Sequence, residues 1–290
     1  MSKIKNLTIY SEKLFSTKNI LVVSDIHRTN KEGYDTGLRN LSRLFNDLSN
    51  GIQRGMYPKI DAILVPGDLV DDTKELENKE FRMMIEEELA FMTKGMPTYI
   101  SLGNHDQMTV GANNEWIKGD ASALREVISR APNTILLEDD KIANFEEIAI
   151  GAFSPQYEYY EVDRERVEEF RSIFDREIRP QFDSSRYNIL MTHTPTGIMA
   201  LSSLEGKCIE SKADLVVSGH MHNGVIKLPK NRGLISPQME LFPEYAHGTN
   251  KIGETLFLIN GPVNTNVGMP IVNKFFKPNA NILTLKPKVR

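Results

Sequence analysis

Residues 19–27 have the sequence NILVVSDIH, in which a short apolar run is followed at once by an aspartate and a histidine. A continuous β-branched run of this length, without polar alternation, is typical of a strand that is buried on both faces of a sheet. In open α/β sheets, functional residues lie just beyond the carboxyl ends of such strands. The stretch therefore predicts an α/β fold with Asp25 and His27 at the edge of a buried sheet.

Similar apolar runs recur along the chain and alternate with amphipathic segments. The runs lie at 19–24, 62–66, 97–103, 147–154, 187–193 and 213–220, followed by ETLFLING and NILTLKP near the end. Apolar residues at helical spacing predict three helices, over Leu38–Ile52, Leu76–Met92 and Ala121–Arg130. The first half therefore has a βαβαβ pattern and the second half is richer in strands, which predicts an α/β (α+β) fold.

The 290-residue chain shows no internal repeat, low-complexity tract or linker at which it would divide. With 40% hydrophobic residues it is long enough to bury a full core. We therefore expect a single domain over residues 1–290. Its most irregular part is the tyrosine-rich and then densely charged insertion 156–186. A solvated helix is the simpler interpretation of this insertion, and a lid over a site is the alternative.

Side chains that bind metals or transfer protons follow five of the predicted strands. They are Asp25 and His27, then Asp68 and Asp71, then Asn104, His105 and Asp106, then His193, and finally His220 and His222. A single histidine in such a position is more often structural. Five of the six histidines of the chain belong to this set, however, and five loops that bring Asp, Asn or His to one edge favour a functional site.

The residue types in this set indicate the kind of metal. Imidazole and carboxylate ligands without a thiolate suit manganese, iron or zinc. If seven side chains of this set are ligands, they are more than one ion normally takes, whereas two ions that share a bridging carboxylate use all seven. Two ions about 3.5–4 Å apart are a known arrangement for in-line displacement at phosphorus. We expect two divalent metal ions, with manganese or iron favoured.

Five short blocks carry a family resemblance. DIH (25–27), GDLVD (67–71), GNHD (103–106), TH (192–193) and GHMH (219–222) resemble, in this order, the signature of the calcineurin-like metallophosphoesterase superfamily, over about residues 19–223. Beyond them, GVIKLP, LFPEYAHG and GPVNTN resemble the bacterial YkuE-like branch. The resemblance implies a four-layer αββα sandwich, in which two mixed β-sheets are flanked by helices.

The resemblance also implies two sets of metal ligands that share one bridging carboxylate, that of Asp68. The set for the first ion is Asp25, His27 and His222. The set for the second ion is Asn104 (through its amide oxygen), His193 and His220. The nucleophile is then a water or hydroxide held between the two ions, whose charge lowers the pKa of that water.

The catalytic residues follow from the same resemblance. His105 is the expected general acid, because the near-neutral pKa of histidine permits protonation of a leaving oxygen. Asp106 is expected to orient His105. Arg28 is a candidate for substrate binding, since a guanidinium suits phosphate oxygens. Asp71 is a second candidate for substrate binding. The alternatives are that Arg28 faces solvent and that Asp71 supports a ligand histidine.

Composition limits the partners and the location. The formal net charge is −4, so the chain has no overall basic field that would gather nucleic acid or an anionic membrane. Its single cysteine, Cys208, excludes an internal disulfide and suits a reducing compartment. The sequence has no apolar run as long as the roughly 18 residues of a membrane span, and the N-terminus lacks the pattern of a signal peptide. We therefore expect a cytoplasmic location.

Several functions fit these observations. The one we favour is a phosphodiesterase that hydrolyses a small phosphodiester or pyrophosphate, nucleotide or lipid-linked. A phosphomonoesterase and a cyclic-nucleotide phosphodiesterase are the alternatives within the family. A DNA-processing nuclease would need basic surface, which the composition does not favour. A catalytically inactive scaffold would lose ligands, whereas this chain retains all seven and His105.

Overall fold

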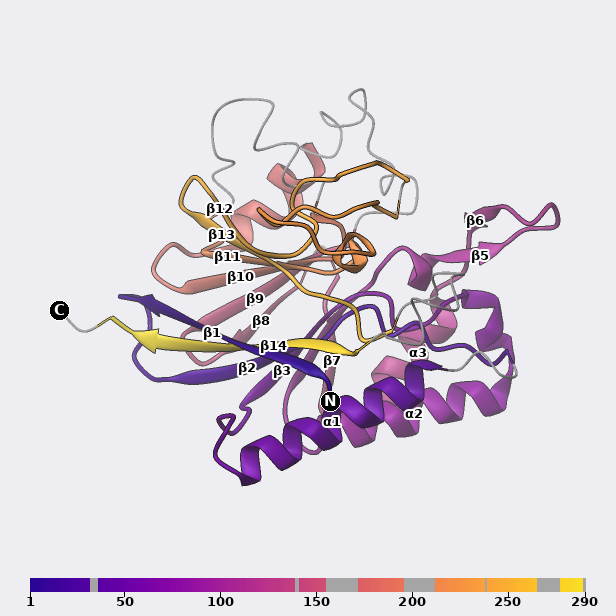
Figure 1. The fold of residues 1–290 in the computed structure, drawn as a ribbon, viewed down its shortest axis with the longest axis horizontal. Helices are drawn as coiled ribbons and strands as arrows, with labels where there is room; N and C mark the ends of the chain where they lie inside the picture. The colour runs from indigo at the N-terminus through magenta and orange to yellow at the C-terminus, as the bar shows by residue number, and fades with distance from the viewer. Residues whose placement is uncertain are drawn as a thin grey trace.

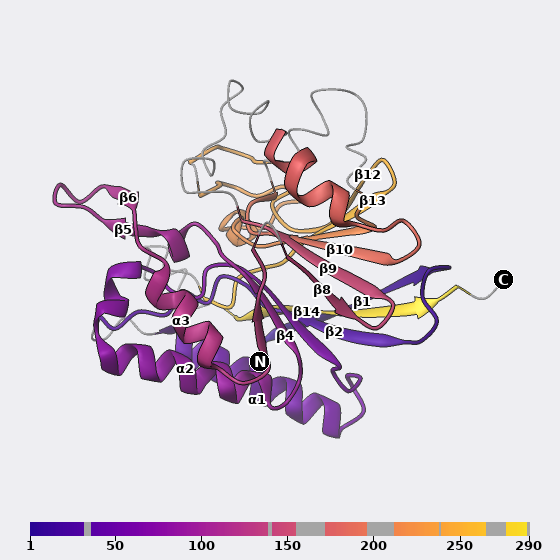
Figure 2. The same ribbon diagram turned by 180° about the vertical axis from the view of Figure 1, so that it is seen from behind.

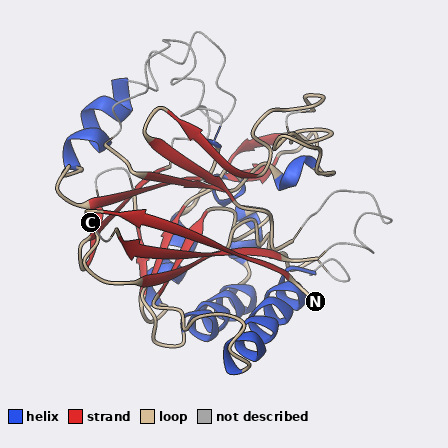
Figure 3. Ribbon diagram, turned by 60° about the vertical axis from the view of Figure 1, so that its left-hand side comes forward, coloured by secondary structure: helices blue, strands red, loops and turns tan. Residues whose placement is uncertain are grey.

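A computed structural model describes residues 1–31, 36–138, 141–154, 172–195, 212–237, 239–264 and 277–288. Two six-stranded sheets lie face to face, with helices on the outer side of each (Figures 1 and 3). This is the α/β fold and the αββα layering expected from the sequence. Among the described residues, no helix combines the length and the apolar character needed to span a membrane.

The first sheet is built mainly from the first half of the chain. Its strands, in spatial order, are β1 (Lys3–Ser11), β14 (Asn279–Pro287), β2 (Lys18–Val22), β3 (Ala62–Pro66), β4 (Thr98–Ser101) and β7 (Thr134–Leu136). The strands from β2 to β7 are parallel, β14 is antiparallel to β2, and β1 is parallel to β14. The parallel arrangement brings the carboxyl ends of β2, β3 and β4 to one edge.

The second sheet comes from the second half of the chain. Its strands, in spatial order, are β12 (Gly248–Ile252), β13 (Thr255–Ile259), β11 (Leu215–Ser218), β10 (Tyr187–Thr192), β9 (Ile148–Phe153) and β8 (Ile142–Phe145). The four central strands are parallel, and the outer strands β8 and β12 are antiparallel to their neighbours. Both sheets are therefore mixed, as expected.

Three helices cover the outer face of the first sheet (Figures 1 and 2). They are α1 (Thr36–Gln53), α2 (Lys79–Thr93) and α3 (Ser122–Arg130). The three predicted helices are thus confirmed, although the second begins later than expected. Residues 73–77 form a separate helical turn, and the Asn78 side chain then caps α2 by accepting from the Glu80 and Phe81 amides.

The described part of the 156–186 insertion supplies the fourth layer. Residues 156–171 lie outside the described residues, so a lid there is not tested. The following turns, Phe174–Ile178 and Arg179–Gln181, lie over the outer face of the second sheet (Figure 2). Phe174, Ile178 and Phe182 are buried against that sheet. The described part is thus helical, as in the simpler interpretation, but it buries one apolar face against the sheet and exposes charged side chains such as Arg176 on the other.

Side-chain alternation along the central strands joins the layers. Leu21 and Val23 pack toward the helices, whereas Ile20 and Val22 pack into the space between the two sheets. All four are fully buried, which confirms that the apolar run at 19–24 is covered on both faces.

A small hairpin stands apart from the two main sheets. Its strands are β5 (Met108–Val110) and β6 (Trp116–Lys118), and it projects from the body of the molecule beyond the GNHD block (Figure 1). All three residues of β6 are exposed.

Candidate metal centre

Both sheets contribute to one polar cluster. Asp25 and His27 follow β2, Asp68 follows β3, and Asn104 follows β4. His193 follows β10, and His220 and His222 follow β11. All seven predicted ligands therefore come from strand ends, and the contacts described below bring them together where the two sheets meet.

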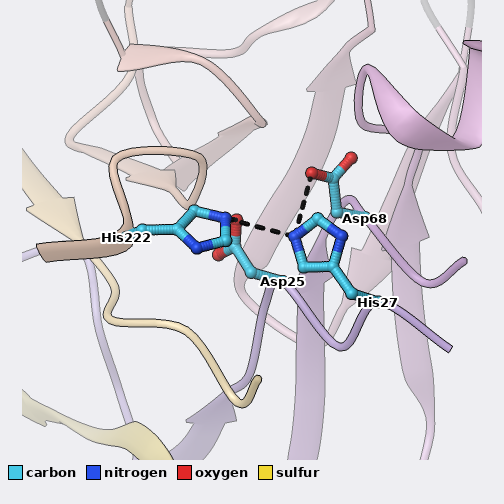
Figure 4. A group of neighbouring side chains, drawn as sticks. All are labelled: Asp25, His27, Asp68 and His222. Atoms are coloured by element: carbon cyan, nitrogen blue, oxygen red, sulfur yellow. Dashed lines mark hydrogen bonds and ion pairs between the residues drawn. The ribbon is translucent and has the colours of Figure 1, made fainter. Parts of the chain in front are cut away.

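The first group of ligand atoms comes from Asp25, His27, Asp68 and His222, and these atoms all lie within 4.8 Å of one another (Figure 4). His27 Nε2 is 3.1 Å from His222 Nε2 and 3.6 Å from Asp68 Oδ2. His222 Nε2 is 3.3 Å from Asp25 Oδ1. Four donors of the types that bind a divalent cation thus converge on one point.

The second group adjoins the first through the Asp68 carboxylate. Asp68 Oδ2, the oxygen that lies 3.6 Å from His27 Nε2, is also 3.0 Å from His193 Nε2. His220 Nδ1 is 3.0 Å from Asn104 Oδ1, and the rings of His193 and His220 have centroids 5.1 Å apart. Asp68 therefore contacts a histidine of each group, as a bridging ligand must.

The backbone at these positions is strained. Five of the seven predicted ligands have positive φ angles, namely Asp25 (55°), His27 (48°), Asp68 (57°), His220 (67°) and His222 (45°). A side-chain-bearing residue rarely adopts this left-handed region, and each instance costs about 1–3 kcal/mol. Strain of this kind persists where the surrounding structure fixes it and is typical of functional sites.

The burial and charge of the two aspartates show whether this cluster suits a cation. Asp25 and Asp68 are both buried, and Asp25 Oδ2 accepts no hydrogen bond from the described residues. Burial opposes their ionisation, yet neighbouring histidines outweigh it and lower the pKa of both carboxyls. Two buried carboxylates in one place need positive charge nearby, and a divalent cation supplies it.

The histidines respond to the same charges. Burial, together with the His193 charge, lowers the pKa of His220 to about 3, so this imidazole is neutral and its lone pair is available to a metal. Burial also acts to lower the pKa of His193, but Asp68 and Asp25 outweigh it and raise that pKa to about 9. Without another cation, His193 thus takes up a proton beside Asp68. The residues fit a centre of two divalent ions.

Asp106 has a role other than the expected one. Its carboxylate accepts four backbone hydrogen bonds, from the amides of Gly103 (2.9 Å), Asp68 (2.8 Å), Leu69 (2.9 Å) and Val70 (3.1 Å). It therefore joins the loop after β4 to the loop after β3. Burial, with the charge of Asp68, raises the pKa of Asp106 to about 6.

His105 is oriented by Asp71 instead. His105 Nδ1 is 2.8 Å from the Asp71 carbonyl oxygen, and a carbonyl can only accept, so Nδ1 carries the proton. The Asp71 carboxylate Oδ1 lies 3.3 Å from His27 Nδ1, on the far side of that ring from the ligand atom Nε2. Asp71 thus holds both the candidate acid and a candidate metal ligand, which agrees with the alternative that it supports a ligand histidine.

Arg28 is buried, contrary to the alternative that it faces solvent. Its side chain is 2% exposed and forms an ion pair with Glu88, and its guanidinium lies 5.7 Å from the ring centroid of Phe81. Its backbone also bonds to Leu69 and Asp71. Binding of substrate by Arg28 therefore stays a prediction, and the contacts of Arg28 within the protein do not support it.

The close approach of two loops makes Gly103 sensitive to substitution. A Cβ at this position would lie 2.5 Å from the Asp68 backbone nitrogen and closer still to its carboxylate. Gly103→Ala is therefore expected to weaken manganese affinity about 10- to 100-fold, by displacing Asp68. Isothermal titration calorimetry measures this. Gly111→Ala is the control, because its nearest neighbours are the flexible side-chain ends of Glu115 and Ile117. Equal affinities in both variants would contradict the prediction.

A cavity of about 430 Å³ opens beside the metal centre. Its polar residues are His27, Asp71, His105, His222 and Ser236, and its apolar residues are Trp116, Met221, Val225, Ile235, Pro237 and Met239. Sequence reasoning did not find the apolar residues. Trp116 is the single tryptophan of the chain, but no motif or spacing relates it to the histidines.

Comparisons with solved structures return distant likenesses. Phosphopantetheinyl hydrolase from Mycobacterium tuberculosis is 14% identical, covering 86% of this chain and 91% of that one, with a TM-score of 0.41. A purple acid phosphatase from yellow lupin (Lupinus luteus) seeds is 11% identical, covering 95% and 55%, with a TM-score of 0.42. An anchor protein of the inner membrane complex of Plasmodium is 13% identical, covering 87% and 73%, with a TM-score of 0.48.

No curated protein matches the sequence. The family comparison, in contrast, covers most of the chain. The sequence model described as calcineurin-like phosphoesterase matches residues 18–224, a range that begins with β2 and includes every predicted metal ligand. The chain therefore belongs to the calcineurin-like phosphoesterase family.

Proposed function

We propose that this protein is a phosphodiesterase that uses two divalent metal ions to hydrolyse a small phosphodiester or pyrophosphate. Family membership supports phosphoric ester hydrolysis, and the seven clustered ligands support a metal centre. Asp25, His27, Asp68 and His222 would hold one ion. Asn104, His193 and His220, with Asp68 shared, would hold the other. When bound, the ions would supply Lewis acidity and would lower the pKa of water.

The charge of the cavity favours a diester over a monoester, and this is the observation that carries the proposal. Among the described residues that line the cavity there is no lysine or arginine, and Asp71 contributes a carboxylate. The phosphorus of a monoester carries up to two negative charges, whereas that of a diester, and each phosphorus of a disubstituted pyrophosphate, carries one. A cavity without fixed positive charge beyond the metal centre suits the lower charge.

The proton on the leaving oxygen would come from His105. Since Nδ1 is bound to the Asp71 carbonyl oxygen, Nε2 is the nitrogen left to exchange a proton with substrate. The ring lines the cavity together with His27 and His222, and its centroid is 4.8 Å from that of His27. The His105 ring is therefore held beside the metal ligands, where a leaving oxygen would develop charge and could take a proton from Nε2.

The proposal is tested by comparing bis-p-nitrophenyl phosphate with p-nitrophenyl phosphate. Metal-stripped protein is assayed with and without manganese, and metal content is measured in parallel. We expect hydrolysis that depends on manganese and a higher kcat/KM for the diester. Preference for the monoester would make the protein a phosphomonoesterase. A protein that binds manganese but cleaves neither ester would contradict the proposal, and one that binds no transition metal would indicate a scaffold.

Replacing His105 separates acid catalysis from metal binding. His105→Asn is expected to lower kcat about 10²- to 10⁴-fold for methyl phenyl phosphate, because phenolate needs a proton as it leaves. The loss is expected to be at least about tenfold smaller for methyl p-nitrophenyl phosphate, whose leaving group is less basic. His247→Asn is the matched control. Like His105, His247 has a ring nitrogen close to a backbone carbonyl, since its Nε2 lies 3.2 Å from the Leu228 oxygen. Equal losses for both substrates would argue against His105 as the acid.

A further inference from the structure

The cavity beside the metal centre combines polar and apolar lining. His27 and His222, two of the predicted metal ligands, line it together with His105, so the cavity and the metal centre are continuous. Its apolar lining includes Trp116 from the β5–β6 hairpin and Val225, Ile235, Pro237 and Met239 from the segment after the GHMH block. A volume of about 430 Å³ is within the range of small-molecule sites.

Apart from the residues of the metal centre and its surroundings, the lining offers few partners to a polar ligand. Ser236 is the only one of the described lining residues with a hydroxyl group, and because its Oγ accepts a hydrogen bond from the Glu240 backbone amide, its O–H is what remains to donate. A nucleobase or sugar needs several partners, and each buried polar group that is left unpaired costs affinity. The lining therefore does not suit a polar ligand and suits a hydrocarbon.

Exposed apolar side chains continue beyond the cavity along the same segment. Met239 is 74% exposed, and Ile226, Leu241, Phe242 and Tyr245 are exposed as well. Isolated exposed apolar residues are common, but several in one segment beside a polar centre indicate a binding surface. The segment that supplies much of the apolar lining thus also carries apolar side chains that are exposed to solvent, and a chain-like substituent could contact them.

Resting on the proposed function, we infer that the substrate is a phosphodiester with one alkyl or acyl substituent, and that Trp116 determines this specificity. The indole ring centroid lies 4.9 Å from that of His105, at an interplanar angle of 77°. Trp116 therefore places an apolar ring directly beside the candidate acid in the wall of the cavity. An alkyl or acyl substituent that runs from the phosphate group along this wall would bury its first carbons against the indole.

Chain length gives a direct kinetic test. We compare kcat/KM for p-nitrophenyl phosphodiesters that carry a methyl, butyl or octyl group, since the leaving group is then constant. Each buried methylene is expected to raise kcat/KM about fourfold, so butyl exceeds methyl by about 10- to 60-fold. Trp116→Ala is expected to reduce the octyl-to-methyl ratio by at least about tenfold. The ratio is taken within each variant, so a general loss of activity cancels.

Ile117→Ala is the matched control. Ile117 is the next residue of β6 and is 42% exposed, and it is not among the residues that line the cavity, so its ratio should stay unchanged. A flat series in the wild type, or faster cleavage of the p-nitrophenyl ester of thymidine 5′-phosphate, would overturn the inference and leave the phosphodiesterase proposal standing.

Binding gives a second readout that does not need catalysis. Trp116 is the only tryptophan in a chain that also contains nine tyrosines, so fluorescence excited selectively at tryptophan reports on this wall alone. The octyl monoester of methylphosphonic acid is a diester analogue in which a P–C bond that resists hydrolysis replaces the P–O bond to the leaving group. It should shift the emission of the manganese-loaded protein, and the methyl monoester should not. Absence of a shift overturns the inference. A shift in a protein that hydrolyses no ester would contradict the proposed function and support the binding site.

Discussion

Asparagine in place of Asp68 is expected to lower the manganese content from about two ions per chain to one or none, and to lower phosphodiesterase kcat/KM by about 10³-fold or more. The Asp68 carboxylate lies close to both His27 and His193, so its charge serves both groups of ligands. The side chains of asparagine and aspartate have the same size, and therefore the change removes charge without creating a cavity.

The measurement pairs metal analysis by mass spectrometry with the bis-p-nitrophenyl phosphate assay. Asp72→Asn is the matched control. Asp72 is also buried, but its Oδ1 caps the next helical turn by accepting from the Lys74 amide, which an asparagine oxygen can replace. The control should retain both metal and activity. A variant at position 68 that keeps two ions would show that Asp68 is not the bridging ligand.

Asp106→Ala is expected to reduce the free energy of unfolding by about 3–5 kcal/mol, the largest effect on stability that we predict. Four backbone amides donate to this carboxylate, and removing it would leave all four buried without an acceptor. Each unpaired buried amide costs about 1–3 kcal/mol, and partial access of water lowers the total. Urea denaturation of the metal-stripped protein measures the change.

Asp106→Asn tests the reason for that loss. The amide oxygen can still accept from two of the four backbone amides, whereas its NH₂ group faces the others, so an intermediate loss is expected. If the structural role is correct, the stability of both variants falls even without metal. An unchanged stability together with reduced activity would instead restore the role expected from the sequence, in which Asp106 only orients His105.

The sequence predicted the central strands because burial on both faces leaves a clear pattern. The runs at 19–24 and 62–66 alternate between two apolar layers in the structure, so no polar residue interrupts them. The ligands were predictable for a related reason. Parallel strands bring their carboxyl ends to one edge, so residues that directly follow the strands are neighbours in space even when they are distant in sequence.

Other features depend on contacts that leave no local pattern. The strand β1 has lysines at positions 3 and 5 on its exposed face and pairs with β14 at the far end of the chain. The four hydrogen bonds to Asp106 come from backbone amides, which every residue has, so the sequence does not reveal them. Trp116 meets His105 only because the β5–β6 hairpin turns back toward the metal centre.

The position of β14 also determines when the first sheet can form. This strand lies between β1 and β2, so residues 279–287 separate two strands that the ribosome makes first. Until residues 279–287 emerge, β2 has an unpaired edge and β1 has no partner in the first sheet. Completion of this sheet therefore waits for a strand made more than 250 residues after β2, and during that interval the open edge of β2 can pair with other chains.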